Sequence, residues 1–167
     1  AITEVGARYE RREYFLPQLI RAAETMQKAF AHLRPLLEKS RGPEERPVIV
    51  MATVEGDIHD IGKNIVCLLL GNHGFEVIDA GKDVPAEQIV ACALEHKARI
   101  IGLSALMTTT MVRMEDTIRL VRERELPIKV LVGGAAVTQA FADAIGADAY
   151  CEDAVSAVRA AKQFVTG

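Results

Sequence analysis

One stretch decides the fold of this chain of 167 residues: Val48-Ile49-Val50-Met51-Ala52-Thr53-Val54-Glu55-Gly56-Asp57-Ile58-His59-Asp60-Ile61-Gly62. Its first seven residues are apolar or β-branched, which is typical of a strand buried inside a parallel sheet. A helical pattern follows and continues to Asn72. His59 is therefore expected on the loop that leaves the carboxyl end of a strand, where open α/β sheets bind their ligands.

The remainder of the chain alternates between strand and helix patterns. Further strands are expected at Phe75–Asp79, Arg99–Ser104, Lys129–Val132 and Ala147–Cys151. Helices are expected at Asp60–Asn72, Ala86–Lys97, Met111–Arg124, Thr138–Ala144 and Ala154–Val165. This alternation predicts a flavodoxin-like (Rossmann-like) α/β fold, in which a five-stranded parallel sheet of order 2-1-3-4-5 is covered by helices on both faces.

The N-terminal part has a different pattern. Apolar residues recur at helical spacing from Leu16 to Glu38, and the polar stretch 41–47 contains two prolines. One or two helices cannot bury their own apolar faces, so this part must pack on something else. We expect a partial helical cap at 1–40, a linker at 41–47 and an α/β domain at 48–167. Because the chain starts with Ala1, we also expect an excised piece of a longer protein.

Composition argues against several classes of protein. The net charge of −3, without a basic stripe, argues against nucleic-acid binding. No apolar run reaches the roughly 18 residues that a membrane span needs. Cys67, Cys92 and Cys151 lack CxxC spacing and lie in apolar or small-residue contexts. We therefore expect free thiols and a cytoplasmic protein.

Three loops after predicted strands carry polar or small residues. The first contains Asp57 and His59, the second runs from Gly102 to Thr110, and the third contains Gly133 and Gly134. Because their strands are neighbours in the expected order, the loops should line one crevice. The small residues are expected to leave room there for a bulky group.

Each loop by itself also has a simpler explanation. A single histidine beside a carboxylate is more often a surface group, paired glycines often make only a tight turn, and a Ser/Thr run can cap a helix. The chain has no GxGxxG after a strand, no P-loop motif and no GxSxG motif. A dinucleotide site, a P-loop and a serine-hydrolase nucleophile are therefore disfavoured.

Taken together, the three loops resemble the signature of the cobalamin-binding domains. The pattern is Asp57-x-His59-x-x-Gly62, then 41 residues, Ser104-x-Leu106, then 26 residues, and Gly133-Gly134. The family includes cobalamin-dependent methionine synthase, the corrinoid proteins of methylotrophic methanogens, and several mutases. The resemblance covers essentially the whole chain. Residues 14–26 resemble the helical cap that the mutases lack, and the first two loops look closest to methionine synthase.

The resemblance implies three catalytic residues. His59 would replace the benzimidazole of the cofactor as the lower cobalt ligand and would be the only metal ligand. Asp57 would accept a hydrogen bond from the other ring nitrogen and fix the tautomer. Thr110 would complete this relay at a position where methionine synthase has serine, and its additional methyl group is expected to change the geometry.

The resemblance also implies other contacts with cobalamin. Gly62 is expected to be the close-packed start of a helix. Tyr9 and Leu16, as cap residues, would shield the methyl face, although both also fit simple helix packing. The implied cofactor-binding residues are Gly56, Asp57, Ile58, His59, Asp60, Gly62, Ser104, Leu106, Thr108, Gly133, Gly134, Ala154, Tyr9 and Leu16.

The implied function is that of a methyl carrier in a methyltransferase. The chain would be a fragment of methionine synthase that binds cobalamin base-off and His-on, carries a methyl group between methyltetrahydrofolate and homocysteine, and does not turn over alone. Its partners would be the homocysteine, methyltetrahydrofolate and reactivation modules, within methionine biosynthesis and one-carbon metabolism. One alternative is a stand-alone corrinoid protein serving a methanol or methylamine methyltransferase. A more distant alternative is a flavodoxin-like binding or signalling domain without cobalt.

Overall fold

The computed structural model describes residues 8–9, 11–15, 17–18, 21–22, 25 and 46–166. The chain divides into two compact units, Ala1–Arg46 and Pro47–Gly167. Within the first unit, residues 17–18, 21–22 and 25 are helical, and the Arg8 guanidinium lies 5.5 Å from the centre of the Tyr14 ring. Most of the helix expected from Leu16 to Glu38, and most of the expected linker, lie outside the described residues.

The second unit is built on a parallel five-stranded sheet of order β2-β1-β3-β4-β5, so the predicted fold class and strand order are confirmed. The strands are β1 (Val48–Val54), β2 (Glu76–Val84), β3 (Ile100–Ser104), β4 (Lys129–Gly133) and β5 (Ala149–Cys151). The helices are α3 (Ile61–Asn72), α4 (Ala86–Glu95), α5 (Thr108–Met111), α6 (Arg113–Glu123), α7 (Gln139–Ala144) and α8 (Ala154–Thr166).

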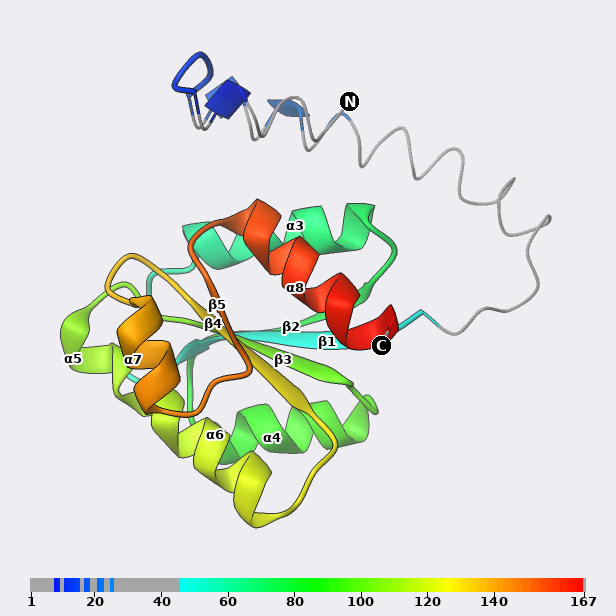
Figure 1. Ribbon diagram of the computed structural model, residues 1–167, viewed down its shortest axis with the longest axis vertical. Coiled ribbons are helices and arrows are strands. Elements are labelled where there is room, and N and C mark those ends of the chain that lie inside the picture. Colours follow the sequence, from blue (N-terminus) through cyan, green and yellow to red (C-terminus); the bar gives the residue numbers. More distant parts are fainter. Residues whose placement is uncertain are drawn as a thin grey trace. The chain divides into compact units, whose positions relative to one another are not determined.

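Helices cover both faces of this sheet (Figure 1). Helices α3 and α8 lie on one face, and α4 and α6 lie on the other. Alternate residues of β1 point to opposite faces. Ile49 and Met51 belong to the apolar cluster that includes residues of α3 and α8, whereas Val50 and Ala52 belong to the cluster that includes residues of α4 and α6. Burial on both sides explains why the strand is one continuous apolar run.

The parallel arrangement brings the three chemically interesting loops to one edge. Thr53 of β1 is paired with Ser104 of β3, and Ser104 is paired with Gly133 of β4. The carboxyl ends of these three neighbouring strands are therefore level. The loops that follow them lie side by side, as the predicted strand order requires.

Two elements differ most from the sequence prediction. Strand β2 was expected to end at Asp79 but continues to Val84, because the turn-type residues that follow are accommodated as irregularities in its pairing with β1. The expected helix Met111–Arg124 is divided at Val112 into α5 and α6. No helix in the described part of the chain is long and apolar enough to cross a membrane.

All three cysteines are free, as predicted. Burial raises the pKa of Cys67 and that of Cys151 to about 11. Thiols of this kind are poor nucleophiles at neutral pH, so both cysteines act as packing groups.

Candidate functional site

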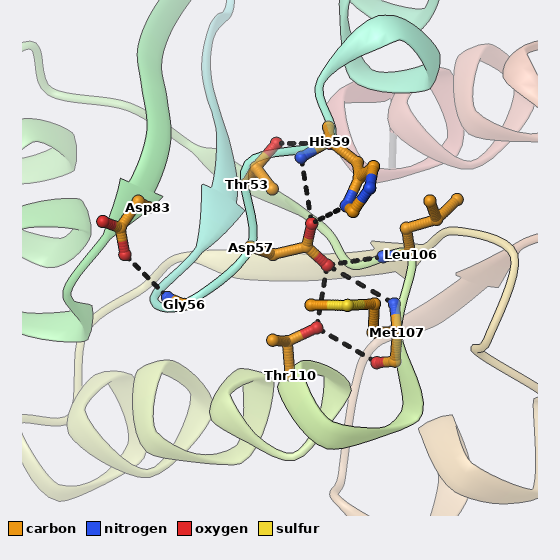
Figure 2. A network of polar contacts seen from close by, with 8 residues as sticks. All are labelled: Thr53, Gly56, Asp57, His59, Asp83, Leu106, Met107 and Thr110. Atoms are coloured by element: carbon orange, nitrogen blue, oxygen red, sulfur yellow. Dashed lines mark hydrogen bonds and ion pairs between the residues drawn. The ribbon is translucent and has the colours of Figure 1, made fainter.

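A fully buried carboxylate, Asp57, forms the centre of the site (Figure 2). Its Oδ1 atom accepts hydrogen bonds from the backbone N–H of His59 at 3.0 Å and from the ring Nδ1 of His59 at 2.8 Å. Its Oδ2 atom accepts from the backbone N–H of Leu106 at 2.8 Å and from the hydroxyl of Thr110 at 2.7 Å. The Met107 N–H lies 3.4 Å from the same oxygen. One carboxylate thus joins the loops that follow β1 and β3.

These donors keep Asp57 ionised. Burial alone would raise the pKa of Asp57, but the hydrogen bonds from the His59 and Leu106 amides and from the Thr110 hydroxyl outweigh it and hold the pKa well below its usual range. An ionised carboxylate can only accept hydrogen bonds, so Nδ1 of His59 must carry the proton in this contact. In the neutral ring, Nε2 then has a free lone pair.

Thr110 stands at the far side of Asp57 from the histidine. Its hydroxyl lies 2.7 Å from Oδ2 of Asp57 and 3.0 Å from the carbonyl oxygen of Met107. Since a hydroxyl has one proton, it serves one of these acceptors at a time, and the ionised carboxylate is the stronger. A Cβ added at Gly56 would lie 3.5 Å from the methyl carbon of Thr110, so this methyl group sits beside the histidine loop without preventing the hydrogen bond.

Sequence reasoning missed two residues that hold the loop from outside it. Asp83, on β2, accepts a hydrogen bond from the Gly56 N–H at 2.7 Å, and its own N–H donates to the Asp57 carbonyl at 2.9 Å. Lys63, in the first turn of α3, is buried and forms an ion pair with Asp79. Asp83 gave no signal because the strand pattern was expected to end before it, and a lysine just inside a helix is an ordinary surface residue.

The histidine itself is accessible, with 46% of its side chain exposed. Large apolar side chains are also exposed on the loops that flank it. Their exposed fractions are 64% for Ile58, 45% for Leu106 and 38% for Met107. Apolar groups gathered at a loop edge are typical of a ligand-binding surface. The site therefore offers one imidazole nitrogen within an apolar surround.

Comparison with known proteins identifies the family. Residues 47–161 match the model of the B12 binding domain, and residues 1–34 match a second B12 binding domain model. The chain is 47% identical to dimethylamine corrinoid protein 3 of Methanosarcina mazei, over 98% of this chain and 99% of that protein. The chain belongs to the B12-binding family.

Two solved structures agree with this membership. A cobalamin-binding protein from Desulfitobacterium hafniense has a TM-score of 0.86 and 37% identity, covering 98% of this chain and 77% of that one. The methanol:cobalamin methyltransferase complex from Methanosarcina barkeri has a TM-score of 0.81 and 32% identity, covering 99% of this chain and 64% of the matched one. The predicted cofactor, cobalamin, is confirmed.

The same comparisons correct the expected partners. Homocysteine, methyltetrahydrofolate and reactivation modules were expected because two loops look closest to methionine synthase. The relatives are instead corrinoid proteins named for dimethylamine and a methyltransferase complex named for methanol, so that prediction was wrong. The partner prediction rested on two short loops alone, whereas the comparison with relatives extends along nearly the whole chain.

The donor set of this B12-binding protein fits its cofactor. No group of three or more His, Cys, Asp or Glu side chains that could hold a metal ion occurs among the described residues. A corrin ring brings its own equatorial nitrogens to cobalt, so one imidazole from the protein is sufficient. The exposed apolar residues on the flanking loops suit a large macrocycle, because packing against it would remove their apolar surface from water.

The glycines of the site fall into two classes. A Cβ at Gly133 would lie 2.7 Å from the Cys151 carbonyl oxygen, and one at Gly134 would lie 2.0 Å from the Ala105 carbonyl oxygen. Neighbouring backbone therefore explains these two glycines without a bulky ligand. At Gly62 nothing lies within 4 Å of a Cβ, so the expected close packing there was wrong, and the helix start faces open space.

The other residues implied by the resemblance are placed as follows. Asp60 is the N-cap of α3 without a capping side-chain bond, Ser104 ends β3, Thr108 begins α5, and Ala154 begins α8 half-buried. Tyr9 is 42% exposed in the first unit. Leu16 lies outside the described residues.

Proposed function

We propose that this protein is a corrinoid protein that carries a methyl group for a methyltransferase acting on a methylamine, with dimethylamine as the first candidate. The observation that carries the proposal is the hydrogen bond of 2.8 Å between the His59 ring and the buried Asp57, which leaves one ring nitrogen free as a ligand. The identity of 47% with a dimethylamine corrinoid protein, along nearly the whole of both chains, supports the choice of substrate class.

In this proposal His59 would hold the cobalt of cobalamin through Nε2, which corresponds to base-off, His-on binding. Asp57 holds the ring in the required tautomer, and Thr110 supports the Asp57 carboxylate from the other side. When bound, cobalamin supplies the cobalt atom that accepts and releases the methyl group. The protein supplies the ligand, its orientation and an apolar surround, and it turns over only together with a methyltransferase.

The remaining implied contacts stay part of the proposal. Ile58 and Leu106 would pack on the macrocycle through their exposed side chains, and the open space at Gly62 would admit the edge of the cofactor. The proposed cofactor contacts are Gly56, Asp57, Ile58, His59, Asp60, Gly62, Ser104, Leu106, Thr108, Gly133, Gly134, Ala154, Tyr9 and Leu16.

We also propose the domain division of the chain: a partial helical cap at 1–40, a linker at 41–47 and the cobalamin-binding domain at 48–167. The match of residues 1–34 to a B12 binding domain model supports the cap. The free cysteines support the cytoplasm as the location.

Two experiments test the proposal. The absorption spectrum of the purified protein with methylcobalamin should shift to the base-off, histidine-ligated form, and His59→Ala should abolish the ligated form. An unchanged spectrum of the parent protein would refute the ligand assignment.

The second experiment mixes the loaded protein with methyltransferases specific for dimethylamine, monomethylamine and methanol in turn. Methyl transfer should be fastest with the dimethylamine enzyme. Transfer only with the methanol enzyme would move the protein to the methanol class, and transfer with none of them would reject the substrate class.

A further inference from the structure

Strand β2 is irregular where it runs beside the end of β1. Met51 is paired with Asp79, Ala52 with Gly81, and Val54 with Val84. Strand β2 therefore contains one extra residue between the first two pairs and another between the last two. Such bulges bend a strand and redirect its side chains, and they occur often beside functional sites.

The second bulge places Asp83 against the entrance of the histidine loop. Its Oδ1 atom accepts from the Gly56 N–H at 2.7 Å (Figure 2). Its own N–H donates to the Asp57 carbonyl at 2.9 Å. The first bond holds the peptide unit that precedes Gly56, and the second holds the peptide unit that follows Asp57. The Asp57 N–H is in turn bonded to the Val54 carbonyl at 3.1 Å. The backbone from which the Asp57 carboxylate projects is thus held on both sides.

The backbone of Asp83 is strained in order to reach this position. Its φ angle is +54°, in the left-handed region that non-glycine residues rarely adopt. Gly56, its partner, has a φ of +80°. Such conformations persist where the surroundings over-determine them, and they cluster at functional sites.

The first bulge holds the exit of the same loop. Asp79 forms an ion pair with the buried ammonium of Lys63 and also accepts from the Gly81 N–H at 2.9 Å. Lys63 donates in addition to the Asn64 side chain at 3.0 Å. Lys63, in the first turn of α3 and four residues after His59, is therefore fixed to β2 as well.

We propose that Asp83 is a positioning residue for the cobalt ligand: through Gly56 and Asp57 it fixes the carboxylate that orients the His59 ring. Lys63 and Asp79 hold the far end of the loop in the same way. The inference rests on the proposed function of His59 as the cobalt ligand. Among the described residues, the hydrogen bonds of Asp83 to this loop go to the backbone of Gly56 and Asp57, so it acts through the loop backbone.

Asp83→Gly is the decisive variant, because glycine accepts the positive φ and keeps the backbone N–H while the side-chain acceptor for Gly56 is removed. The first measurement is the ¹⁵N NMR spectrum of the His59 ring in the cofactor-free protein, which reports whether Nδ1 or Nε2 carries the proton. The ratio of the Nδ1–H to the Nε2–H tautomer should fall about fivefold, as expected when one hydrogen bond no longer supports the geometry.

The second measurement is the absorption spectrum with saturating methylcobalamin, in which the ratio of histidine-ligated to unligated cofactor should fall by a similar factor of about five. Asp83→Asn should restore both measurements to near the parent values, since asparagine offers an acceptor oxygen and tolerates a positive φ.

A matched control lies at the opposite end of the strands. Asp148, just before β5, accepts from the Val130 N–H at 2.8 Å, much as Asp83 accepts from Gly56. Asp148→Ala should lower stability and leave both measurements unchanged. Parent-like tautomer and ligation ratios in Asp83→Gly, or equal changes in both variants, would overturn the inference.

The two hypotheses fail in different ways. If the parent protein with methylcobalamin shows no histidine-ligated spectrum, the proposed function is rejected. The tautomer ratio in the cofactor-free protein would still decide whether Asp83 positions the ring.

Discussion

Two aspartates at opposite edges of the sheet show how the same side chain serves different ends. Asp148, at the amino edge, accepts from Arg122 at 2.7 Å and Lys129 at 2.8 Å. Asp57, at the carboxyl edge, is held by backbone amides, one hydroxyl and one imidazole. Hydrogen bonds hold the pKa of each carboxyl below its usual range against the opposing effect of burial. The first charge is neutralised by fixed cations, whereas the second is left to act on a histidine.

A buried carboxylate without a permanent cationic partner remains able to orient and polarise a neighbouring group. An arginine or lysine beside Asp57 would compete with the imidazole for the carboxylate oxygens. Neutral donors stabilise the charge without cancelling it, so its field is directed at the Nδ1 proton of His59. The amino edge has no comparable group to orient, and its ion pairs connect β4, α6 and the start of β5.

The largest effect is expected from Asp57→Asn. Donors face both oxygens of Asp57, so an amide must direct its NH₂ group at one of them, and the free energy of unfolding should fall by about 3 kcal/mol. Histidine ligation of added methylcobalamin should be lost as well. Urea unfolding and the absorption spectrum measure the two effects. Parent-like ligation in Asp57→Asn would show that Asp57, like Asp148, serves stability alone.

Thr110→Val should have an intermediate effect. The substitution keeps the shape of the side chain and removes one hydroxyl donor from a buried carboxylate, so we expect a loss of about 1.5 kcal/mol in the free energy of unfolding. The ligated fraction should decrease without vanishing, because the backbone donors to Asp57 remain. Thr110→Ser is the matched control and should preserve ligation. Equal ligation in the valine and serine variants would show that the hydroxyl is dispensable.

Asp148→Asn should cost less, about 1 kcal/mol, because its two cationic partners are half-exposed to solvent. The pKa of Asp148 is lowered in the folded protein, so its stabilisation is present above the unfolded pKa and is lost as the pH falls through the folded pKa. The stability difference from the parent protein should therefore be constant between about pH 5 and 7 and shrink below about pH 4. Urea unfolding at several pH values measures it. A difference that grows at low pH would contradict this assignment.

The smallest effect on stability is expected from Gly62→Ala. Nothing lies near a Cβ there, and alanine is the better helix former, so stability should be unchanged or rise by up to about 0.5 kcal/mol. The affinity for methylcobalamin should fall if the cofactor approaches this face, which titration by absorbance measures. Gly71, in the same helix and also with open space, provides the control with unchanged affinity. Unchanged affinity in both variants would remove Gly62 from the site.

Much of this protein could be predicted from its sequence, because the determining patterns are local. The apolar run of β1 and the alternation after it indicated the sheet order, and the resemblance of three loops to the cobalamin-binding domains implied the cofactor. Predictions that depend on distant neighbours fared differently. The close approach of the Cys151 and Ala105 carbonyl oxygens to positions 133 and 134 could not be read from the sequence. The methylamine class of relatives emerged only from comparison along the whole chain.

The sequence by itself determined the strand that precedes His59, the order of the sheet and the presence of one histidine and one aspartate on the same loop. Periodicity and strand-end position depend on residues within a few positions of each other, so they can be recognised without a structure. Only the tertiary structure decided that Asp57 is fully buried and that the Thr110 hydroxyl lies 2.7 Å from its Oδ2 atom. It also decided that Asp83 on β2 accepts a hydrogen bond from the loop. Those contacts join residues 26 to 53 positions apart, and only the packed, bulged sheet brings them within the reach of a hydrogen bond.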